Sequence, residues 1–395
     1  MTTEFLRPFI NKQVSLRFAG QGLRFDLSQS LFSSFDIDAG SRLLLKTVAQ
    51  QVDLTAVAAA LDVGCGVGVL GLCVQKANPQ AQVTLQDRDA LAVAFAAHNA
   101  RLNKLRRVTV QGGLAFQGTE GRHFDLILSN LPGKAGEPAL QAMLAQMAAH
   151  LTENGTAAVV VVRPLADRVA AALAQQQSVV VHQEEGTGYV VFHFRGGDGV
   201  ADATLTPYLR GQVDFAVGGQ HMMLQTAYNL PEFDNLGYDT ALAATAVRQE
   251  KVSGRVLIWN PGQGHLPVYL RLLAGQAVTH YTLASRDALS LEISAHNLVA
   301  HGIADAQITS LHSPDFTQVA GEFDWVCIFP DTDAGAPWQA RLLPHGAQLL
   351  SPQGRLLVTA KSTHVFRMLE SGHSLAKQAD RKKQGYRTLL LRRRP

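Results

Sequence analysis

Short apolar runs alternate with longer amphipathic segments from residue 58 onward. The runs predict strands near 58–63, 81–86, 107–111, 124–129, 156–162, 178–183 and 188–195. Apolar residues at helical spacing predict helices over 69–77, 89–102, 137–150 and 164–176. This alternation predicts an α/β fold, a doubly wound and mostly parallel sheet with helices on both faces. The last two strands enclose a glycine turn, which predicts an antiparallel hairpin at the sheet edge.

The second half of the chain repeats the first. RDALAVAFAAHN begins at Arg88 and RDALSLEISAHN begins at Arg286, an offset of 198 residues. The same offset aligns Asp62 with Asn260, Gly64 with Gly262, Gly66 with Gly264, Gly68 with Leu266, Asp87 with Ser285 and Phe35-Asp36 with Phe233-Asp234. An offset of 199 residues aligns Phe124-Asp125 with Phe323-Asp324 and Ala135-Gly136 with Ala334-Gly335. Two tandem domains of common ancestry are therefore predicted.

The two domains are separated by residues 196–207, GGDGVADATLTP, which have the composition of a linker. We expect one domain over 1–197 and the other over 205–395. The first begins with a β-rich extension over 1–31, followed by a polar loop and an amphipathic helix over 32–48.

Three glycines follow the strand predicted at 58–63. Gly64, Gly66 and Gly68 follow Asp62 at alternate positions, and glycine tolerates positive φ and lets a ligand approach the backbone. A carboxylate at this place repels a pyrophosphate but suits a cation, such as the ammonium of S-adenosylmethionine (SAM). Asp87 ends the next apolar run, where ribose hydroxyls are normally bound. These residues predict a SAM site in the first domain, with Cys65 as a small side chain inside the turn.

The aligned residues of the second copy lack these groups. Asn260 replaces Asp62, Leu266 replaces Gly68 and Ser285 replaces Asp87 in this alignment. A leucine crowds the turn, and a serine cannot accept two ribose hydroxyls as a carboxylate does. The second domain is therefore predicted to be structural or substrate-binding, and not to hold the cofactor.

The strand predicted at 124–129 leads into Asn130-Leu131-Pro132-Gly133. This stretch resembles the N-P-P-F/Y motif of methyltransferases that modify an exocyclic amine of a base. Such an amine is a poor nucleophile, and an Asn oxygen that accepts its N–H favours attack on the methyl group. The resemblance implies catalytic roles for Asn130 and Pro132, and it also implies that Asn130 is one of the cofactor-binding residues. The second copy has Phe329-Pro330-Asp331-Thr332 at this place, without an amide.

Taken together, the chain resembles the tandem ribosomal-RNA guanine-N2 methyltransferases of the "methyltransferase small" family. FSSFDIDAGSRLLL is similar to the family segment that precedes the SAM domain and closes over the methionine part of SAM. That resemblance implicates Asp38, Gly40 and Ser41 in cofactor binding. It implies two Rossmann-like class I methyltransferase domains, one of them degenerate, and RNA as partner. The family usually places the degenerate copy first, whereas here it comes second.

Two positions depart from the family motif. Leu131 replaces its first proline, and Gly133 replaces the aromatic residue that stacks on the base. Stacking contributes about 1–3 kcal/mol. Another aromatic side chain substitutes (Phe32, Phe35 or Phe116), the substrate is a small molecule or protein instead, or the chain is a non-catalytic SAM- and RNA-binding pseudo-methyltransferase. Phe35, Leu131, Gly133 and Lys134 are the expected substrate-binding residues.

The composition of the chain says less about its binding partners than the motifs do. A net charge of +3 does not by itself indicate nucleic acid, but residues 377–395 are strongly basic, which suits either phosphate contacts or a solvated strand end. Three cysteines without metal-ligand spacing predict a reducing compartment, and no histidine pattern predicts a metal. Without an apolar run of membrane-spanning length, we expect a soluble, cytoplasmic protein.

Overall fold

The computed structural model describes residues 3–32, 35–201, 203–332 and 337–394. The chain divides into two compact units, a first unit over Met1–Tyr208 and a second unit over Leu209–Pro395. The domain limits expected from the sequence, 1–197 and 205–395, stay a prediction. Among the described residues, no helix is long and apolar enough to cross a membrane.

The first unit is built on a seven-stranded sheet with the order β5-β4-β3-β6-β7-β9-β8. Its strands are β3 (Ala59–Val63), β4 (Gln82–Asp87), β5 (Val108–Gly112), β6 (Phe124–Asn130), β7 (Leu151–Val162), β8 (Val179–Glu185) and β9 (Tyr189–Arg195). Neighbours from β5 to β7 run parallel, and β9 pairs antiparallel with both β7 and β8. The predicted parallel sheet with an antiparallel edge hairpin is confirmed.

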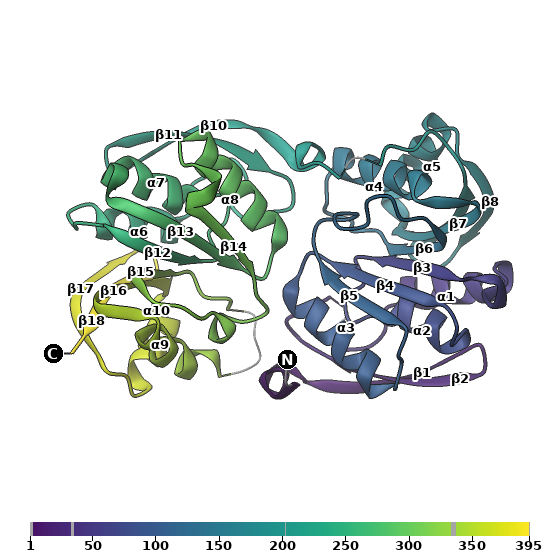
Figure 1. Ribbon diagram of the computed structural model, residues 1–395, viewed down its shortest axis with the longest axis horizontal. Coiled ribbons are helices and arrows are strands. Elements are labelled where there is room, and N and C mark those ends of the chain that lie inside the picture. The colour runs from purple at the N-terminus through teal and green to yellow at the C-terminus, as the bar shows by residue number, and fades with distance from the viewer. Residues whose placement is uncertain (1–2, 33–34, 202, 333–336, 395) are drawn as a thin grey trace. The chain divides into compact units, whose positions relative to one another are not determined.

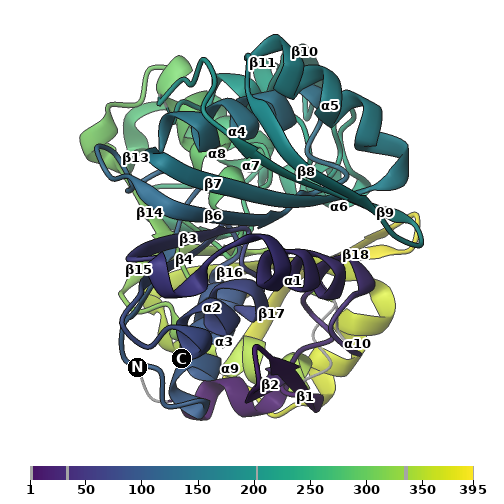
Figure 2. The same ribbon diagram turned by 90° about the vertical axis from the view of Figure 1, so that its right-hand side faces the viewer.

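Helices cover both faces of this sheet (Figure 1). The α-helices are α1 (Ala39–Gln51), α2 (Val69–Ala77), α3 (Ala90–Leu102), α4 (Glu137–Ala149) and α5 (Ala166–Gln175). Figures 1 and 2 place α1, α2 and α3 on one face and α4 and α5 on the other. The 3-10 helices are η1 (Thr3–Phe9), η2 (Leu54–Ala56), η3 (Arg163–Leu165) and η4 (Thr206–Tyr208).

An antiparallel hairpin, β1 (Lys12–Phe18) with β2 (Gln21–Leu27), forms the N-terminal extension. Asn99 of α3 fixes it to the sheet, since its side chain accepts from the N–H of Asp26 and donates to the carbonyl oxygens of Asp26 and Val67. Asn99 therefore joins the hairpin to the loop that precedes α2.

The second unit repeats this architecture, with the sheet order β14-β13-β12-β15-β16-β18-β17. Its strands are β10 (Leu209–Val217), β11 (Gln220–Ala227), β12 (Gly254–Trp259), β13 (Val278–Ser285), β14 (Ile308–His312), β15 (Phe323–Ile328), β16 (Leu350–Lys361), β17 (Leu375–Lys383) and β18 (Tyr386–Arg393). Its helices are α6 (Tyr238–Val247), α7 (His265–Ala274), η5 (Gly275–Ala277), α8 (Ala288–Ala300), η6 (Asp305–Gln307), η7 (Phe316–Gln318), α9 (Trp338–Gln348) and α10 (Ser362–Glu370).

The two units also share their topological details. Asn297 of α8 holds the β10–β11 hairpin as Asn99 holds the β1–β2 hairpin, through bonds to the backbone of Gln225 and Gln263. Two Rossmann-like units of the same topology are thereby confirmed. Apolar residues of both sheet faces form the cores, which explains why the strands read as continuous apolar runs in the sequence.

Candidate functional site

The site of the first unit lies where β3 turns into α2, at the carboxyl edge of the sheet. Gly64, Gly66 and Gly68 all have positive φ, of 72°, 54° and 91°. The N–H groups of Gly64 and Cys65 donate to the carbonyl of Gln86, at 2.8 and 3.0 Å, and so fix the turn against β4. Glycine satisfies this backbone without steric cost.

The three glycines serve different purposes. A Cβ atom built on Gly64 or Gly66 meets nothing within 4 Å, so the backbone there borders open space that a ligand can fill. A Cβ on Gly68 lies 3.0 Å from Leu72 and 3.3 Å from Leu85, so this glycine allows α2 to pack closely on the sheet. The first two glycines thus fit a cofactor site, and the third supports it.

Asp62 lies beneath this turn and is fully buried. Its Oδ2 accepts from the N–H of Gly71 at 2.8 Å, while Oδ1 has no hydrogen-bond partner in the described part of the chain. Burial, together with the nearby charge of Asp87, raises the pKa of Asp62 to about 7, against the lowering effect of the Gly71 bond. A buried carboxylate with one oxygen unpaired fits a cationic or N–H-bearing ligand group.

Gly71 was not expected from the sequence. A Cβ on this residue lies 2.2 Å from Leu85 and 3.0 Å from the Cβ of Asp62, so no larger side chain fits. A glycine inside an apolar helical segment is the signal that could have identified it.

Asp87 closes the other side of the turn. Its Oδ2 accepts from the N–H of Gly66 at 2.8 Å, and its Oδ1 accepts from the N–H of Asp89 at 2.9 Å. Burial raises the pKa of Asp87 to about 6, although both backbone bonds lower it. Each carboxylate oxygen has a second lone pair, so the two bonds leave acceptor capacity for hydroxyl groups.

A second group of predicted residues meets around Asn130, at the end of β6. Its Nδ2 donates to Oδ1 of Asp38 at 3.1 Å and to Oγ of Ser41 at 3.2 Å. Asp38 is the N-cap of α1 and accepts from the N–H of Ser41 at 2.9 Å. Since a carboxylate oxygen only accepts, these bonds fix the amide with its nitrogen toward α1 and leave Oδ1 of Asn130 without a partner among the described residues.

The remaining residues of the predicted motif line the loop after β6. Leu131 is buried in the core, and its N–H donates to the carbonyl of Val160 at 2.9 Å. Pro132, Gly133 and Lys134 are exposed. Leu131 thus anchors the loop by packing, and the three exposed residues border the solvent.

Gly40 has a packing role. A Cβ on this residue lies 2.8 Å from the ring of Tyr189, so the glycine lets the start of α1 approach β9. Sequence reasoning had singled out Gly40 but missed Tyr189. Ser33 and Ser34 of the same segment lie outside the described residues, as do Ala334 and Gly335 of the second copy.

The three aromatic candidates for base stacking differ in exposure. Phe32 and Phe35 are 72% and 65% exposed, so either ring is available to a base. Phe116 is fully buried and packs against His150, with ring centroids 4.7 Å apart. The expectation that Phe116 could replace the missing aromatic residue is wrong, because a core side chain cannot reach a substrate.

The thiol in the glycine turn has no sign of nucleophilic activation. Cys65 is buried, and burial, with the charges of Asp87 and Asp62, raises the pKa of its thiol. The thiolate is the reactive form, so this environment opposes reactivity. Over the described ranges, no three His, Cys, Asp or Glu side chains group as metal ligands.

The strand register corrects the alignment of the two copies at the turn. In the first unit Asp62 pairs with Leu85 and Leu128, and the corresponding pairs in the second unit are formed by Ile258 with Leu283 and Cys327. Gly68 and Gly264 are the N-caps of α2 and α7, both in the left-handed region. The offset at the turn is therefore 196, not 198: Ile258 takes the place of Asp62, Asn260 of Gly64, Gly262 of Gly66 and Gly264 of Gly68.

This register shows how the second unit differs. Asn260 has φ 56°, close to the backbone of Gly64, but it carries a side chain where Gly64 borders open space. Its Nδ2 donates to the carbonyl of Phe329 at 2.9 Å and to Asp331 at 3.0 Å, and its Oδ1 accepts from Ser285 at 3.0 Å. The second unit thus fills the equivalent space with its own side chain.

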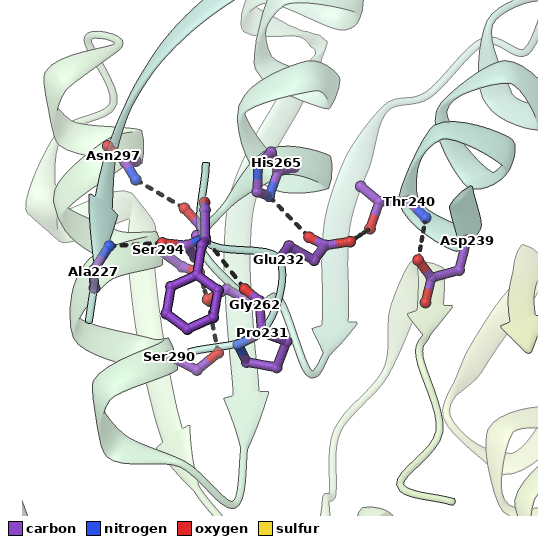
Figure 3. Close-up of polar contacts among 12 residues, drawn as sticks. Ala227, Pro231, Glu232, Asp239, Thr240, Gly262, His265, Ser290, Ser294 and Asn297 are labelled. Carbon is purple, nitrogen blue, oxygen red and sulfur yellow. Dashed lines mark hydrogen bonds and ion pairs between the residues drawn. The ribbon is translucent and has the colours of Figure 1, made fainter. Parts of the chain in front are cut away.

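Further contacts tie the second turn to its surroundings (Figure 3). Ser290 and Ser294 of α8 both donate to the carbonyl of Gly262, at 2.8 and 3.0 Å. The carboxylate of Glu232 lies 3.4 Å from Nδ1 of the buried His265, at the start of α7, and accepts from Thr240 of α6 at 3.3 Å. No sequence motif had indicated Glu232 or His265.

Residues 22–193 match the family model of the methyltransferase small domain. The match agrees with the resemblance noted in the sequence, and the matched residues include the glycine turn, Asp38 and Asn130.

Curated relatives match about a third of the chain. The ribosomal RNA small subunit methyltransferase C of Haemophilus influenzae is 34% identical over 129 residues, 32% of this chain and 37% of the relative. Its Pseudomonas putida counterpart is 37% identical over 131 residues, with the same two shares. The matches thus span just over a third of the length of these relatives.

A solved structure resembles the chain over both units. The T. thermophilus 16S rRNA N2 G1207 methyltransferase, in complex with AdoMet and guanosine, aligns with a TM-score of 0.66 at 18% identity. The alignment covers 97% of this chain and 98% of that one. The tandem arrangement of two Rossmann-like methyltransferase folds is therefore shared.

Proposed function

We propose that the protein is a SAM-dependent methyltransferase that acts on an exocyclic amine of a base in RNA, with N2 of guanine in ribosomal RNA as the target. The observation that carries this proposal is the fixed amide of Asn130. Asp38 and Ser41 bind its nitrogen, and its oxygen stays available at the end of β6. The names of the curated relatives, ribosomal RNA small subunit methyltransferases, support the choice of substrate.

The residues of the glycine turn fit SAM. The open space at Gly64 and Gly66 admits a ligand, the unpaired Oδ1 of Asp62 suits its ammonium group, and Asp87 retains lone pairs for ribose hydroxyls. When bound, SAM supplies a methyl group on a sulfonium, which is electron-poor and open to attack by an amine. β3 and β6 are neighbours in the sheet, so the cofactor turn and Asn130 share one edge.

The chain's contribution to the reaction is orientation. Oδ1 of Asn130 accepts one N–H of the amine, and a backbone carbonyl of the loop from Leu131 to Gly133 accepts the other. These bonds favour localisation of the nitrogen lone pair toward the methyl group. Pro132 restricts the loop and keeps the two acceptors aligned.

Gly133 favours a second candidate, a methyltransferase for a small molecule or protein, because it offers no ring for stacking. Incubation with tritiated SAM separates the candidates. Unmodified small-subunit ribosomal RNA, total protein and a metabolite fraction serve as acceptors, and labelled RNA is digested to nucleosides. We expect the label in N2-methylguanosine. Label confined to protein or metabolites supports the second candidate, and SAM binding without transfer to any fraction supports a pseudo-methyltransferase.

The remaining parts of the proposal follow from an RNA substrate. The partner would be ribosomal RNA, free or within a ribosomal particle, and the place of action would be the cytoplasm. The catalytic roles of Asn130 and Pro132, the cofactor contacts of Asp38, Gly40, Ser41 and Cys65, and the substrate contacts of Phe35, Leu131, Gly133 and Lys134 belong to the same proposal.

A further inference from the structure

We propose that the tip of the β17–β18 hairpin in the second unit, formed by Arg381, Lys382 and Lys383, is a docking surface for RNA phosphates. The choice of RNA as the partner rests on the proposed function. The assignment of the surface itself rests on the charge, exposure and position of these three side chains, all of which are exposed.

The basic tip lies at the edge of the sheet that normally binds ligands. β16 runs parallel to β15 and ends at Lys361, which pairs with Tyr386 at the start of β18. Lys383 pairs with the same tyrosine, so the tip adjoins the carboxyl end of β16. Figure 2 shows the loop between β17 and β18 projecting beyond the body of the sheet. In α/β folds ligands bind outside the carboxyl ends of the strands.

The charges of the tip are not neutralised within the protein. Asp380 is the only acid between residues 377 and 394, and it binds Arg387 at 2.6 Å and Lys377 at 3.1 Å. In the described part of the chain, Arg381, Lys382 and Lys383 have no acidic partner within ion-pair distance. Three exposed cations on one hairpin tip supply the positive charge that binds a nucleic-acid backbone.

The first unit supplies an internal comparison. In the antiparallel register, Glu184 pairs with Val191 where Arg381 pairs with Thr388, and Glu185 takes the place of Lys382. The two glutamates bind Lys46 and Arg163, at 2.8 and 2.6 Å. The same hairpin therefore folds with either sign of charge.

This comparison shows that the simplest structural role of charged residues at the tip does not explain their positive sign. β17 is an edge strand, and charged side chains protect such strands from pairing with other molecules. The glutamates of β8, the edge strand of the first unit, serve that purpose equally well. Edge protection requires charge of either sign, whereas phosphate binding requires positive charge.

The test replaces two basic residues of the tip with the acidic residues that the first unit has at the equivalent positions. The double variant Arg381→Glu/Lys382→Glu carries the residues that β8 has at these positions. The control variant Arg17→Glu/Arg106→Glu makes the same change in net charge at two exposed arginines of the first unit. Binding of a fluorescein-labelled fragment of small-subunit ribosomal RNA to the full-length protein is followed by anisotropy over a series of salt concentrations.

We expect the tip variant to bind RNA at least tenfold more weakly and with a salt slope lower by about two, since each phosphate contact contributes about 0.9. The control should keep the wild-type slope. Both should bind SAM as wild type does, because that site lies in the other unit. If the tip variant does not fold, the neutral pair Arg381→Gln/Lys382→Gln should show the same loss of slope.

The outcomes separate this inference from the proposed function. A wild-type slope in the tip variant overturns the docking surface, even where the wild-type protein methylates RNA. Loss of slope in the tip variant, together with no methyl transfer to RNA by the wild-type protein, overturns the proposed reaction and leaves the docking surface standing. Equal loss of slope in the tip and control variants also overturns the inference, since it indicates an effect of overall charge.

Discussion

Asn130 donates a hydrogen bond through Nδ2 to Oδ1 of Asp38 over 3.1 Å, and this bond decides what the amide can do. The carboxylate cannot donate, so it holds the nitrogen side of the amide and turns the oxygen side away. Asp38 is itself fixed as the N-cap of α1 by the N–H of Ser41. Orientation of a single acceptor thus depends on the start of a helix 92 positions earlier in the chain.

The first prediction concerns Asn130 and its orienting partner. Asn130→Ala should lower kcat roughly a hundredfold or more, as removal of one oriented transition-state group does, with little change in SAM affinity. Asp38→Asn should also lower kcat, because an amide partner allows Asn130 to turn either way. Single-turnover transfer from tritiated SAM, with SAM affinity from calorimetry, provides the measurement. Unchanged transfer by Asn130→Ala would rule out the proposed mechanism.

The second prediction concerns the pH dependence of cofactor binding. Burial raises the pKa of Asp62 to about 7, so below that pH the free protein carries this carboxyl protonated. An ammonium ligand favours the ionised form, and binding should therefore release a proton. SAM affinity should rise as the pH increases through about 7. The measurement stays below the pKa of an α-amino group, about 7.7–8.0, so that the amino group of SAM remains an ammonium.

The variant Asp62→Asn serves as the comparison for this titration. It should bind SAM more weakly and retain a shallower dependence centred near 6, the pKa to which burial raises Asp87. Calorimetry in buffers of different ionisation enthalpy counts the protons directly. A flat affinity profile in wild type would contradict the pairing of Asp62 with the cofactor.

The third prediction concerns the missing aromatic residue. Gly133 has room for a side chain, since its Cβ would lie 3.6 Å from Val162 and 3.9 Å from Leu165. Gly133→Phe should raise affinity for RNA by up to about tenfold to a hundredfold if stacking is lacking, equivalent to about 1–3 kcal/mol. Phe35→Ala should raise KM for RNA if its exposed ring already stacks. An unchanged KM in both variants would argue against a base as substrate.

The sequence predicted the strands well because their apolar runs are buried on both faces of a parallel sheet, as the adjacent residues Ala60 and Leu61 of β3 are. It predicted the residues of the cofactor turn because glycine at positive φ has a recognisable spacing. It did not predict that Phe116 is buried, since an aromatic residue near a strand end looks the same in the sequence whether its side chain is buried or exposed.

The alignment of the two copies failed at the turn for a physical reason. The segment from Gly264 to Ser285 is two residues longer than the segment from Gly68 to Asp87, and η5 lies within it. The sequence identity that follows this insertion gave the offset of 198 residues. The hydrogen-bonded strand register that precedes the insertion corresponds instead to an offset of 196 residues. Sequence similarity in one segment cannot reveal a change in helix and loop length in the neighbouring segment, where the strands on either side keep the same pairing.

The fourth prediction follows from the corrected register. Asn260 occupies the position of Gly64, so Gly64→Asn should fold and should abolish SAM binding by filling the open space. The control is Gly20→Asn, a glycine of the β1–β2 turn that also has positive φ and open space at its Cβ. Calorimetry should find one SAM per chain in wild type and in the control, and none in Gly64→Asn. Two SAM sites per chain in wild type would contradict the inference that the side chain of Asn260 fills the equivalent space in the second unit.

The last prediction concerns Glu232, whose carboxylate contacts His265 and Thr240 in the second unit. Burial raises its pKa from 4.5 to about 7, and the charge of Asp239 adds to the effect. A carboxyl that is more basic in the folded state binds a proton that the unfolded chain releases. The contribution of Glu232 to the stability of the second unit should therefore fall as the pH rises from about 4.5 to about 7, and then level off.

Glu232→Gln keeps an acceptor for Thr240 but removes the buried charge, so it should remove this contribution to the pH dependence and stabilise the second unit above pH 7 relative to wild type. His265 contributes in the opposite direction, because burial lowers its pKa from 6.5 to about 4, so the unfolded chain binds a proton in this range that the folded protein does not. Since His265 is present in both proteins, the difference in unfolding free energy between wild type and Glu232→Gln isolates Glu232, and this difference should fall as the pH rises. Calorimetric unfolding of the full chain identifies the second unit as the transition that SAM does not shift. The exposed control Glu322→Gln should retain the wild-type slope. A slope that Glu232→Gln leaves unchanged would assign the pH dependence to other groups and show that the carboxylate of Glu232 is ionised in the folded protein at much lower pH.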